Sequence, residues 1–300
     1  MYNTFGDNMD GIVVINKPVN YTSHDVINIL RKILNTKKLG HTGTLDPDAS
    51  GVLVVGVNKG TKIMKYLNSD DKIYEARACF GRSTDTLDKT GEILEQEEVT
   101  SIDNLDEVIE SFKGIYTQTP PMYSAIKYKG KRLYEYARQG ITIEDIPSRD
   151  ITVYDIRRTS DVEYSDNCAF FDYQVHASKG LYVRTLSYDI GKECGYPAHN
   201  FDLKRVQAGK FHLDQSYTLE QMEKGEYTII SMSDALSHLP KLIIKDHLRH
   251  HVQNGMAISI SEFESPELTR IVEEDGTLLA IYDKHETQYK MKAQNVFLKD

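Results

Sequence analysis

The chain has 300 residues, of which 40% are hydrophobic and 27% are charged, and its formal net charge at pH 7 is −9. This composition allows a sizeable buried core, argues against a largely disordered chain, and fits about two domains on length alone. The acidic balance gives no general attraction to a polyanion. It does not exclude a nucleic acid either, because nucleic acids respond to local basic patches.

Targeting and redox signals are also weak. No apolar run approaches the roughly 18 residues of a membrane span, and Met1–Asp10 has no signal-peptide pattern. Cys79, Cys168 and Cys194 are odd in number and far apart, so they match neither a zinc spacing nor a disulfide framework. We therefore expect a protein of the reducing cytoplasm with no membrane segment.

The first third of the chain begins with an apolar strand over 11–15, which ends before Lys17-Pro18. Thr22-Ser23 offers a cap for a helix over 25–34, whose apolar residues recur at helical spacing. A turn-rich loop over 40–51 then leads into a buried strand over 52–55. Between the first strand and the helix, Asn20 occupies a turn position at which Asn tolerates a positive φ.

Further along, 71–80 alternates like a half-buried strand, and 91–112 carries eight acids and no base, which favours a solvated acidic helix. Residues 120–148 form an insertion rich in Tyr and Lys. Strands are expected at 151–156, 169–176 and 181–186, a helix at 186–194, a linker at 237–240 and a compact β-rich module over 241–300. This mixture without a regular βαβ rhythm predicts an α+β fold.

The loop over 40–51 holds three glycines, one proline and the acid candidate Asp46, and it is well placed to hold a carboxylate at the rim of a core. An isolated Asp-Pro is by itself a common turn initiator. Asp48 is expected to be an exposed turn residue.

Several motifs occur in a fixed order over about 9–210. They are Lys17-Pro18 with Thr22-Ser23, Gly40-His-Thr-Gly-Thr-Leu-Asp-Pro-Asp-Ala-Ser-Gly-Val-Leu53, Tyr74, Gly81-Arg-Ser-Thr-Asp-Thr86 with Asp88 and Gly91, Gln118-Thr-Pro-Pro-Met-Tyr-Ser-Ala-Ile-Lys127, Ser178-Lys-Gly-Leu-Tyr-Val-Arg-Thr185, Ala198-His199 and Leu203-Lys-Arg205. Together they resemble the bacterial tRNA pseudouridine-55 synthase (TruB) family.

The resemblance implies isomerisation of a uridine in the T-loop of tRNA to pseudouridine, with no cofactor and no metal. It implies that Asp46 is the catalytic aspartate, that Arg184 is its partner, and that Tyr74 stacks on a flipped base and takes part in proton transfer. Whether Asp46 attacks covalently or assists an elimination through a glycal-type intermediate stays open. Without the resemblance, an arginine or tyrosine in a strand has an ordinary structural explanation.

For substrate binding, the resemblance implies that Tyr182 and Leu203 belong to the pocket, that His41 helps to hold the loop of the RNA open, and that Lys17 braces the site. In the insertion, cations alternate with tyrosines, which suits phosphates and unstacked bases. The insertion therefore matches the mobile segment with which the family grips the T-loop, and its expected contacts are Lys127, Lys129, Lys131 and Arg132.

The expected architecture is a pseudouridine-synthase-type, mainly antiparallel mixed sheet flanked by helices over 1–238, followed by a small PUA-like domain over 241–300. The expected partner is the T-arm and T-loop of tRNA, with no obligate protein partner and a monomeric state. His247, His250 and His251 lack a recognisable ligand pattern and are interpreted as surface residues.

Two other function classes remain as alternatives. A non-catalytic RNA-binding or tRNA-folding module gains nothing from a shielded anion near phosphates. A nucleoside or glycoside hydrolase would need two working carboxylates, of which the loop offers Asp46 and Asp48.

Overall fold

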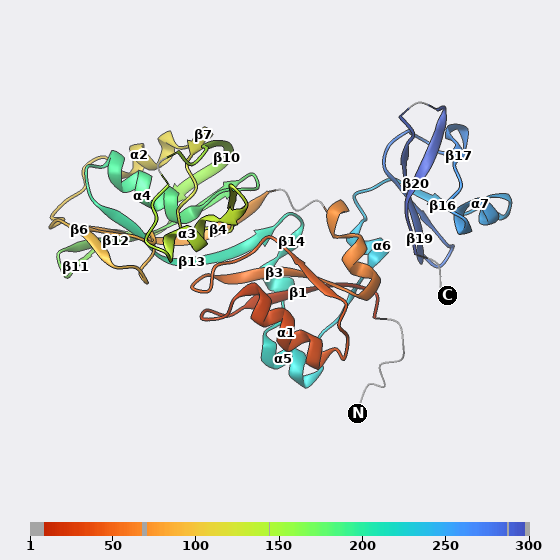
Figure 1. Cartoon of the computed structure of the whole chain (residues 1–300), viewed down its shortest axis with the longest axis horizontal. Helices are drawn as coiled ribbons and strands as arrows, with labels where there is room; N and C mark the ends of the chain where they lie inside the picture. The colour runs from red at the N-terminus through yellow and green to blue at the C-terminus, as the bar shows by residue number, and fades with distance from the viewer. Residues whose placement is uncertain (1–8, 68–70, 144, 287, 298–300) are drawn as a thin grey trace.

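The computed structural model describes residues 9–67, 71–143, 145–286 and 288–297. Two main sheets organise these residues, a large one that extends from the N-terminal region to residue 231 and a smaller one near the C-terminus (Figure 1). The mixed α+β class predicted from the sequence is confirmed.

The large sheet has 11 strands, and its main path runs in the order β15-β1-β3-β13-β4-β12-β10-β7. Its pairs are antiparallel except β13 with β3, which is parallel. The bounds are β1 (Gly11–Lys17), β2 (Leu39–Thr42), β3 (Ser50–Val57), β4 (Lys72–Phe80), β7 (Gly114–Gln118), β10 (Arg149–Arg158), β11 (Glu163–Ser165), β12 (Cys168–Ala177), β13 (Ala198–Ala208), β14 (Phe211–His212) and β15 (Ile230–Ser231).

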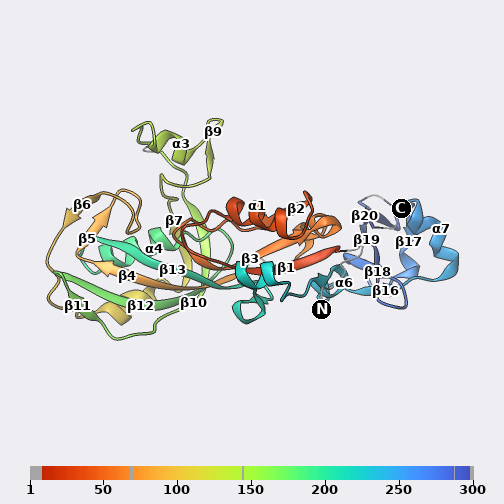
Figure 2. The ribbon, with the colours of Figure 1, turned by 90° about the horizontal axis from the view of Figure 1, so that it is seen from below.

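Helices cover this sheet in two neighbouring cores. Helix α1 (Ser23–Ile33) packs apolar side chains against β1 and β3, while α2 (Leu105–Ser111) and α4 (Val183–Glu193) pack against β4, β10 and β12. Two further short helices follow the large sheet's long strands, α5 (Leu219–Lys224) and α6 (Met232–Ala235), and the 3-10 turns of this region are η1 (Asn58–Lys62), η2 (Met64–Tyr66) and η3 (Leu213–Gln215). Figure 2 shows α1 and α4 on the same side of the large sheet.

The insertion projects from that same side of the sheet (Figure 2). It contains the two-stranded hairpin of β8 (Lys127–Tyr128) and β9 (Lys131–Arg132), followed by helix α3 (Leu133–Ala137). The cations of the insertion lie beside tyrosine rings. For example, Lys129 Nζ lies 5.1 Å from the centroid of the Tyr128 ring, and Arg138 Cζ lies 5.3 Å from that of Tyr134.

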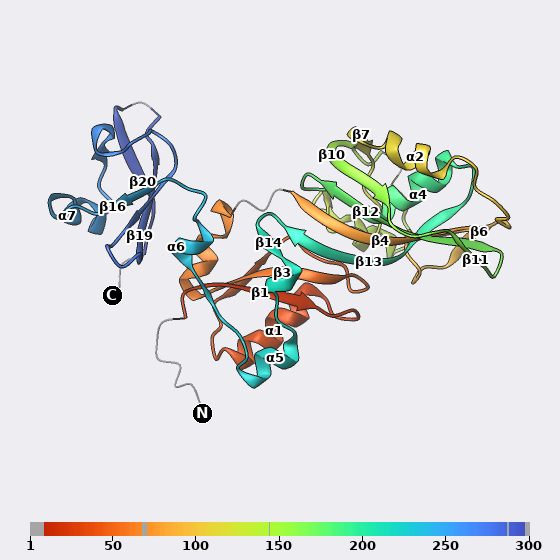
Figure 3. The same cartoon turned by 180° about the vertical axis from the view of Figure 1, so that it is seen from behind.

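The smaller sheet has five strands in the order β16-β18-β19-β20-β17 and lies at one end of the molecule (Figures 1 and 3). Its bounds are β16 (Lys241–Ile243), β17 (Ile258–Ser259), β18 (Thr269–Val272), β19 (Leu278–Lys284) and β20 (Lys290–Val296), with η4 (Asp246–Leu248), α7 (Arg249–Gln253) and η5 (Ile260–Glu262) between them. Tyr66 Oη donates to Asn295 Oδ1 at 2.6 Å, so η2 connects the two sheets.

Most of the expected elements are present, with local corrections. Helix α1 begins at the predicted cap, where Thr22 and Asp25 form a reciprocal capping box, and Asn20 has the expected positive φ of 66°. The strand expected over 181–186 is wrong, because α4 begins at Val183. Its apolar residues Val183, Leu186 and Ile190 follow a helical spacing that the preceding Leu181-Tyr182 obscures.

The single acidic helix expected over 91–112 is also wrong. The segment contains strand β6 (Ile93–Gln96), which pairs with β5 (Arg82–Thr84), and only then the short helix α2. The backbone of Ile93–Gln96 pairs with β5, and this pairing overrides the helical pattern of the segment. The loop expected over 40–51 is shorter, because β2 extends to Thr42.

Candidate active site

The segment that carries Asp46 is fixed by backbone hydrogen bonds on both sides of this residue. Ser23, at the start of α1, accepts a bond from the Leu45 N–H at 3.0 Å and donates to the Leu45 carbonyl at 3.3 Å. The Pro47 carbonyl accepts from Asn20 N at 2.8 Å and from Lys17 Nζ at 3.3 Å. Asp46 is therefore held between two anchored neighbours, which limits the positions that its carboxylate can reach.

The end of this segment approaches β13 closely. Gly51 has φ +102°, and a Cβ there would lie 2.2 Å from the Arg205 carbonyl oxygen, so only glycine fits. Arg205 is fully buried, and its guanidinium donates to Val52 O and Gly43 O, both at 2.8 Å. Since Arg205 is opposite Tyr74 in the β13–β4 register, the loop and Tyr74 lie side by side.

Arg184, in the first turn of α4, joins three segments that are distant in sequence. Its Nη2 lies 3.0 Å from Asp46 Oδ2 and donates to the Tyr123 carbonyl at 2.8 Å. Its Nη1 donates to the Thr86 carbonyl at 2.9 Å and lies 3.3 Å from Asp88 Oδ2. One guanidinium thus contacts the Asp46 loop, the 86–88 turn and the base of the insertion.

The two carboxylates around Arg184 differ in environment. Asp88 is buried, and its Oδ1 accepts from Thr86 Oγ1, Thr90 N and Thr90 Oγ1. The Asp46 side chain is 41% exposed, while that of Arg184 is 5% exposed. The expectation that Asp46 is shielded from water is therefore wrong for this structure, because its carboxylate faces an open cavity.

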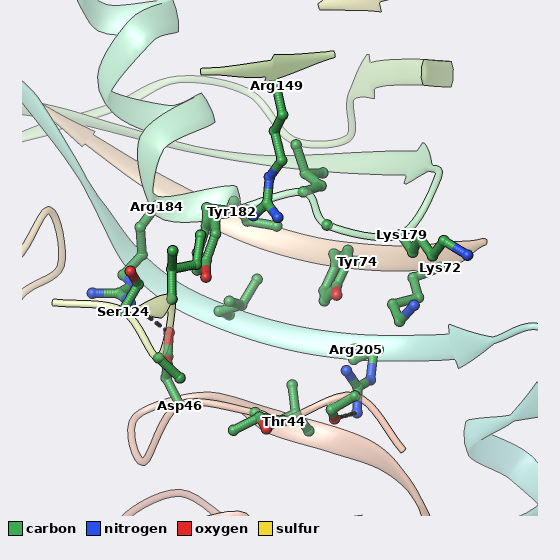
Figure 4. Close-up of a pocket in the computed structure, with 18 residues that line it drawn as sticks. Thr44, Asp46, Lys72, Tyr74, Ser124, Arg149, Lys179, Tyr182, Arg184 and Arg205 are labelled. Atoms are coloured by element: carbon green, nitrogen blue, oxygen red, sulfur yellow. Dashed lines mark hydrogen bonds and ion pairs between the residues drawn. The ribbon is translucent and has the colours of Figure 1, made fainter. Parts of the chain in front are cut away.

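The cavity in front of Asp46 has a volume of about 500 Å³ (Figure 4). Among its described lining residues, Asp46 is the single carboxylate, against five cationic side chains: Lys72, Arg149, Lys179, Arg184 and Arg205. The remaining polar or aromatic lining residues include Tyr74, Ser124 and Tyr182. An excess of positive charge around one carboxylate suits a polyanionic ligand that brings one neutral reacting group to Asp46.

Five residues singled out from the sequence line this one cavity: Asp46, Tyr74, Tyr182, Arg184 and Leu203. Tyr74 comes from β4 and Leu203 from β13. Tyr182 is the residue before α4, and not in a strand as expected. Arg149 lies over the Tyr182 ring, with Cζ 5.0 Å from its centroid, which favours stacking of the ring against one wall.

Two other residues predicted for the site lie outside the lining. Lys17 is fully buried and donates to the carbonyls of Pro18, Tyr21 and Pro47, and burial lowers its pKa to about 8. His41 is half-buried on β2, and burial lowers its pKa as well. His41 Nδ1 is buried, and the described residues give it no hydrogen-bond partner.

The four cations expected in the insertion are also absent from the described lining of the cavity. Lys127, Lys129, Lys131 and Arg132 are on the β8–β9 hairpin, and the insertion reaches the cavity through Ser124, Ala125 and Ile126 instead. The base of the insertion thus lies at the cavity, whereas its cationic hairpin projects away from the large sheet (Figure 2).

Asp48 does not line the cavity that contains Asp46. It lines a second hollow together with Glu75, Asp202 and Lys204. Its side chain is 21% exposed, so the expectation of an exposed turn residue is wrong, and burial raises the pKa of its carboxyl.

Some residues at or beside the site had no role assigned from the sequence. They are Arg205, Asp88, Lys72, Arg149 and Lys179. Arg205, Asp88 and Lys179 are within the recognised motifs, whereas Lys72 on β4 and Arg149 on β10 are brought to the site only by strand pairing.

Within the described ranges, no helix is long and apolar enough to span a membrane, and no three His, Cys, Asp or Glu side chains are grouped as metal ligands. His247 lies instead 3.3 Å from the Glu262 carboxylate. All three cysteines are free, with Cys79 and Cys168 buried.

A family model described as "TruB family pseudouridylate synthase (N terminal domain)" matches residues 31–183. Two similar proteins are each named "tRNA pseudouridine synthase B". The one from Bacillus subtilis (strain 168) is 44% identical over 290 residues, covering 92% of this chain and 94% of the relative. The one from Staphylococcus aureus (strain MW2) is 42% identical over 303 residues, covering 96% and 99%.

Solved structures show the same fold. A chain of a Cbf5-Nop10-Gar1 complex superimposes with a TM-score of 0.68 and 27% identity, covering 97% of this chain and 84% of the other. A chain of an H/ACA RNP bound to a substrate RNA containing 2'-deoxyuridine has a TM-score of 0.68, 23% identity and coverage of 97% and 86%, so it supports the fold alone.

Proposed function

The chain belongs to the TruB family of pseudouridylate synthases, and from this membership we propose that it converts uridine 55 in the T-loop of tRNA to pseudouridine. The family confirms the resemblance and the pseudouridine-synthase-type fold expected from the motifs. The relatives' shared name supports pseudouridine formation in tRNA. The position within the T-loop and the role of Asp46 are the specific content of the proposal.

The observation that carries the proposal is the Asp46–Arg184 ion pair at 3.0 Å on the wall of a cavity that also contains Tyr74 and Tyr182. The target base of a folded tRNA loop must leave its stack to reach such a site, at a cost of a few kcal/mol that pocket contacts offset. Tyr74 and Tyr182 supply flat faces for the extruded base, and Leu203 adds an apolar wall.

Apart from the exchange of one proton, the reaction moves atoms only within the substrate. The N1–C1′ bond breaks and its electron pair leaves with the uracil ring. The ring then turns, C5 bonds to C1′, the C5 proton is lost and N1 gains a proton. Asp46 is the carboxylate close to the sugar, acting either by covalent attack or by assisting elimination, and Tyr74 is placed for a proton transfer. The step needs no redox partner, no cofactor and no metal.

Two rival functions fit the site less well. Hydrolysis by paired carboxylates is disfavoured because Asp46 and Asp48 line different hollows. Pure RNA binding gives no reason for a carboxylate among the five cations that line the cavity, since an anion there repels phosphates.

We propose that cations outside the cavity hold the T-arm. Exposed Lys127, Lys129, Lys131 and Arg132 of the hairpin are placed to grip phosphates. His41 helps to hold the loop of the RNA open, and Lys17 braces the site through the Pro47 carbonyl. The proposal includes a catalytic domain over 1–238, a PUA-like domain over 241–300, and a cytoplasmic monomer. Sedimentation of the purified protein tests the monomeric state.

The experiment is to incubate unmodified tRNA with the purified protein and map the modified uridines along the RNA. The proposal expects a single pseudouridine at position 55 and no free uracil. Pseudouridine at another position would refute the assigned target, free uracil would indicate a hydrolase, and bound but unmodified tRNA would indicate a binding module.

A further inference from the structure

Gln118 ends β7 at the point where the insertion begins, and its side chain is fully buried. Its amide pairs with the backbone of one residue, Tyr182. The Tyr182 N–H donates to Gln118 Oε1 at 2.8 Å, and Gln118 Nε2 donates to the Tyr182 carbonyl at 3.0 Å. The Tyr182 carbonyl also accepts from the Leu186 N–H at 3.1 Å, whereas the Tyr182 N–H can pair only with an acceptor, so its bond to Oε1 fixes which way the amide is turned.

Tyr182 is the residue from which α4 starts, and it makes no side-chain cap for the helix. Its ring lines the cavity, and Arg184 follows two residues later with its guanidinium on Asp46. The amide of Gln118 is therefore a buried contact with the backbone of the residue that carries the ring and directly precedes the helix.

A second contact extends this connection along the helix. Gln118 Nε2 also donates to Tyr116 Oη at 3.1 Å, and Tyr116 Oη in turn donates to the Asp189 carboxylate on α4. Burial raises the pKa of Tyr116, so its phenol keeps the proton that it donates. Tyr116 and Gln118 thus hold two points of α4 against β7, one at the start of the helix and one nearly two turns further.

We propose that Gln118 is a positioning residue for the isomerisation, which it supports by holding the Tyr182 backbone so that the Tyr182 ring and the Arg184 guanidinium face Asp46. This inference rests on the proposed function. Gln118 does not line the cavity among the described residues, so it acts through Tyr182 and not by touching the substrate. Loss of the amide should slow the chemical step and leave tRNA affinity unchanged.

The test uses two variants of the full-length protein. Gln118→Met has similar volume and no hydrogen-bonding groups, so it removes the pairing with little change in packing. Gln118→Glu keeps the acceptor for the Tyr182 N–H at all pH values. It can donate to the Tyr182 carbonyl only when its carboxyl is protonated, and burial favours that form. Gln174→Leu, on the opposite face of the sheet, is the matched control.

The measurements are the single-turnover rate of pseudouridine formation and the Kd for tRNA, at pH 6, 7 and 8, well below each variant's melting temperature. We expect Gln118→Met to be slower by roughly 10- to 100-fold at every pH, with Kd within threefold of the unsubstituted protein. The rate of Gln118→Glu, divided by that of the unsubstituted protein, should rise as the pH falls. Dividing by the unsubstituted rate removes the pH dependence that Asp189 and Tyr116, the neighbouring titratable groups, give to both proteins.

The inference is overturned if Gln118→Met reacts within twofold of the unsubstituted protein, if its loss is entirely in Kd, or if the relative rate of Gln118→Glu does not change with pH. Should Gln118→Met fail to fold, the pH dependence of Gln118→Glu decides by itself. An unsubstituted protein that forms no pseudouridine would instead refute the proposed function, so the two failures are distinguishable.

Discussion

Replacing Arg184 by lysine keeps the positive charge and removes the planar fork that holds Asp46. The guanidinium contacts Asp46, Asp88 and two carbonyls, and an ammonium on a shorter side chain cannot span them. A hydrogen bond to a charged group contributes about 1.5–3 kcal/mol. Because Asp46 is 41% exposed, water replaces part of that contact, so the lower value applies. We expect a single-turnover rate at least roughly tenfold lower.

The assay follows the release of tritium from RNA labelled at C5 of uridine, with enzyme in excess, since the proposed chemistry loses the C5 proton. Arg77→Lys is the matched control, because Arg77 pairs with Asp172 and Glu163 outside the described lining of the cavity. Arg77→Lys should react at the rate of the unsubstituted protein. A folded Arg184→Lys variant that reacts within twofold of that rate would refute the reasoning about the fork.

Three other outcomes follow from the structure. Replacing Lys127, Lys129 and Lys131 by alanine should flatten the dependence of log Kd on log salt by about 0.7–0.9 per lost phosphate contact, and an unchanged slope would contradict a phosphate role. The Lys17 pKa of about 8 in the folded protein is below its ordinary 10.5. Between pH 8 and 10.5, therefore, the unfolded chain keeps a proton on Lys17 that the folded protein has lost. The unfolding free energy relative to Lys17→Met should therefore rise from pH 8 to 10.5, by at most about 3 kcal/mol, whereas a constant difference would show that Lys17 does not titrate there. Removing divalent ions from the enzyme with a chelator should leave its rate on prefolded tRNA unchanged, and a rate restored only by a metal would count against the chemistry.

Local sequence signals predicted the parts of the fold that depend on neighbouring residues. The cap at Thr22 and the positive φ at Asn20 depend on short-range hydrogen bonds and sterics, and both are present. The start of α4 was missed because Tyr182 offers no capping side chain. Its place is set instead by Gln118, which is 64 residues earlier in the chain.

The candidate reacting residues of the site were predictable from the sequence, whereas some of the cations that surround them were not. The motif order placed Asp46, Arg184 and Tyr74 in one site, and the structure brings these three side chains to one cavity. The cations Lys72 and Arg149 come from strands β4 and β10, which meet only through the strand β12 between them. No local sequence pattern indicates which strands pair, so these two cations could not be predicted from the sequence.

The most direct measurement of the central claim uses Asp46→Asn, which keeps the shape of the side chain and removes its charge. We predict that this variant releases no tritium from C5-labelled tRNA in a single turnover and binds the same tRNA with a Kd within a few-fold of the unsubstituted protein. Pseudouridine formation at an undiminished rate would contradict the assignment of Asp46 as the carboxylate that carries the reaction.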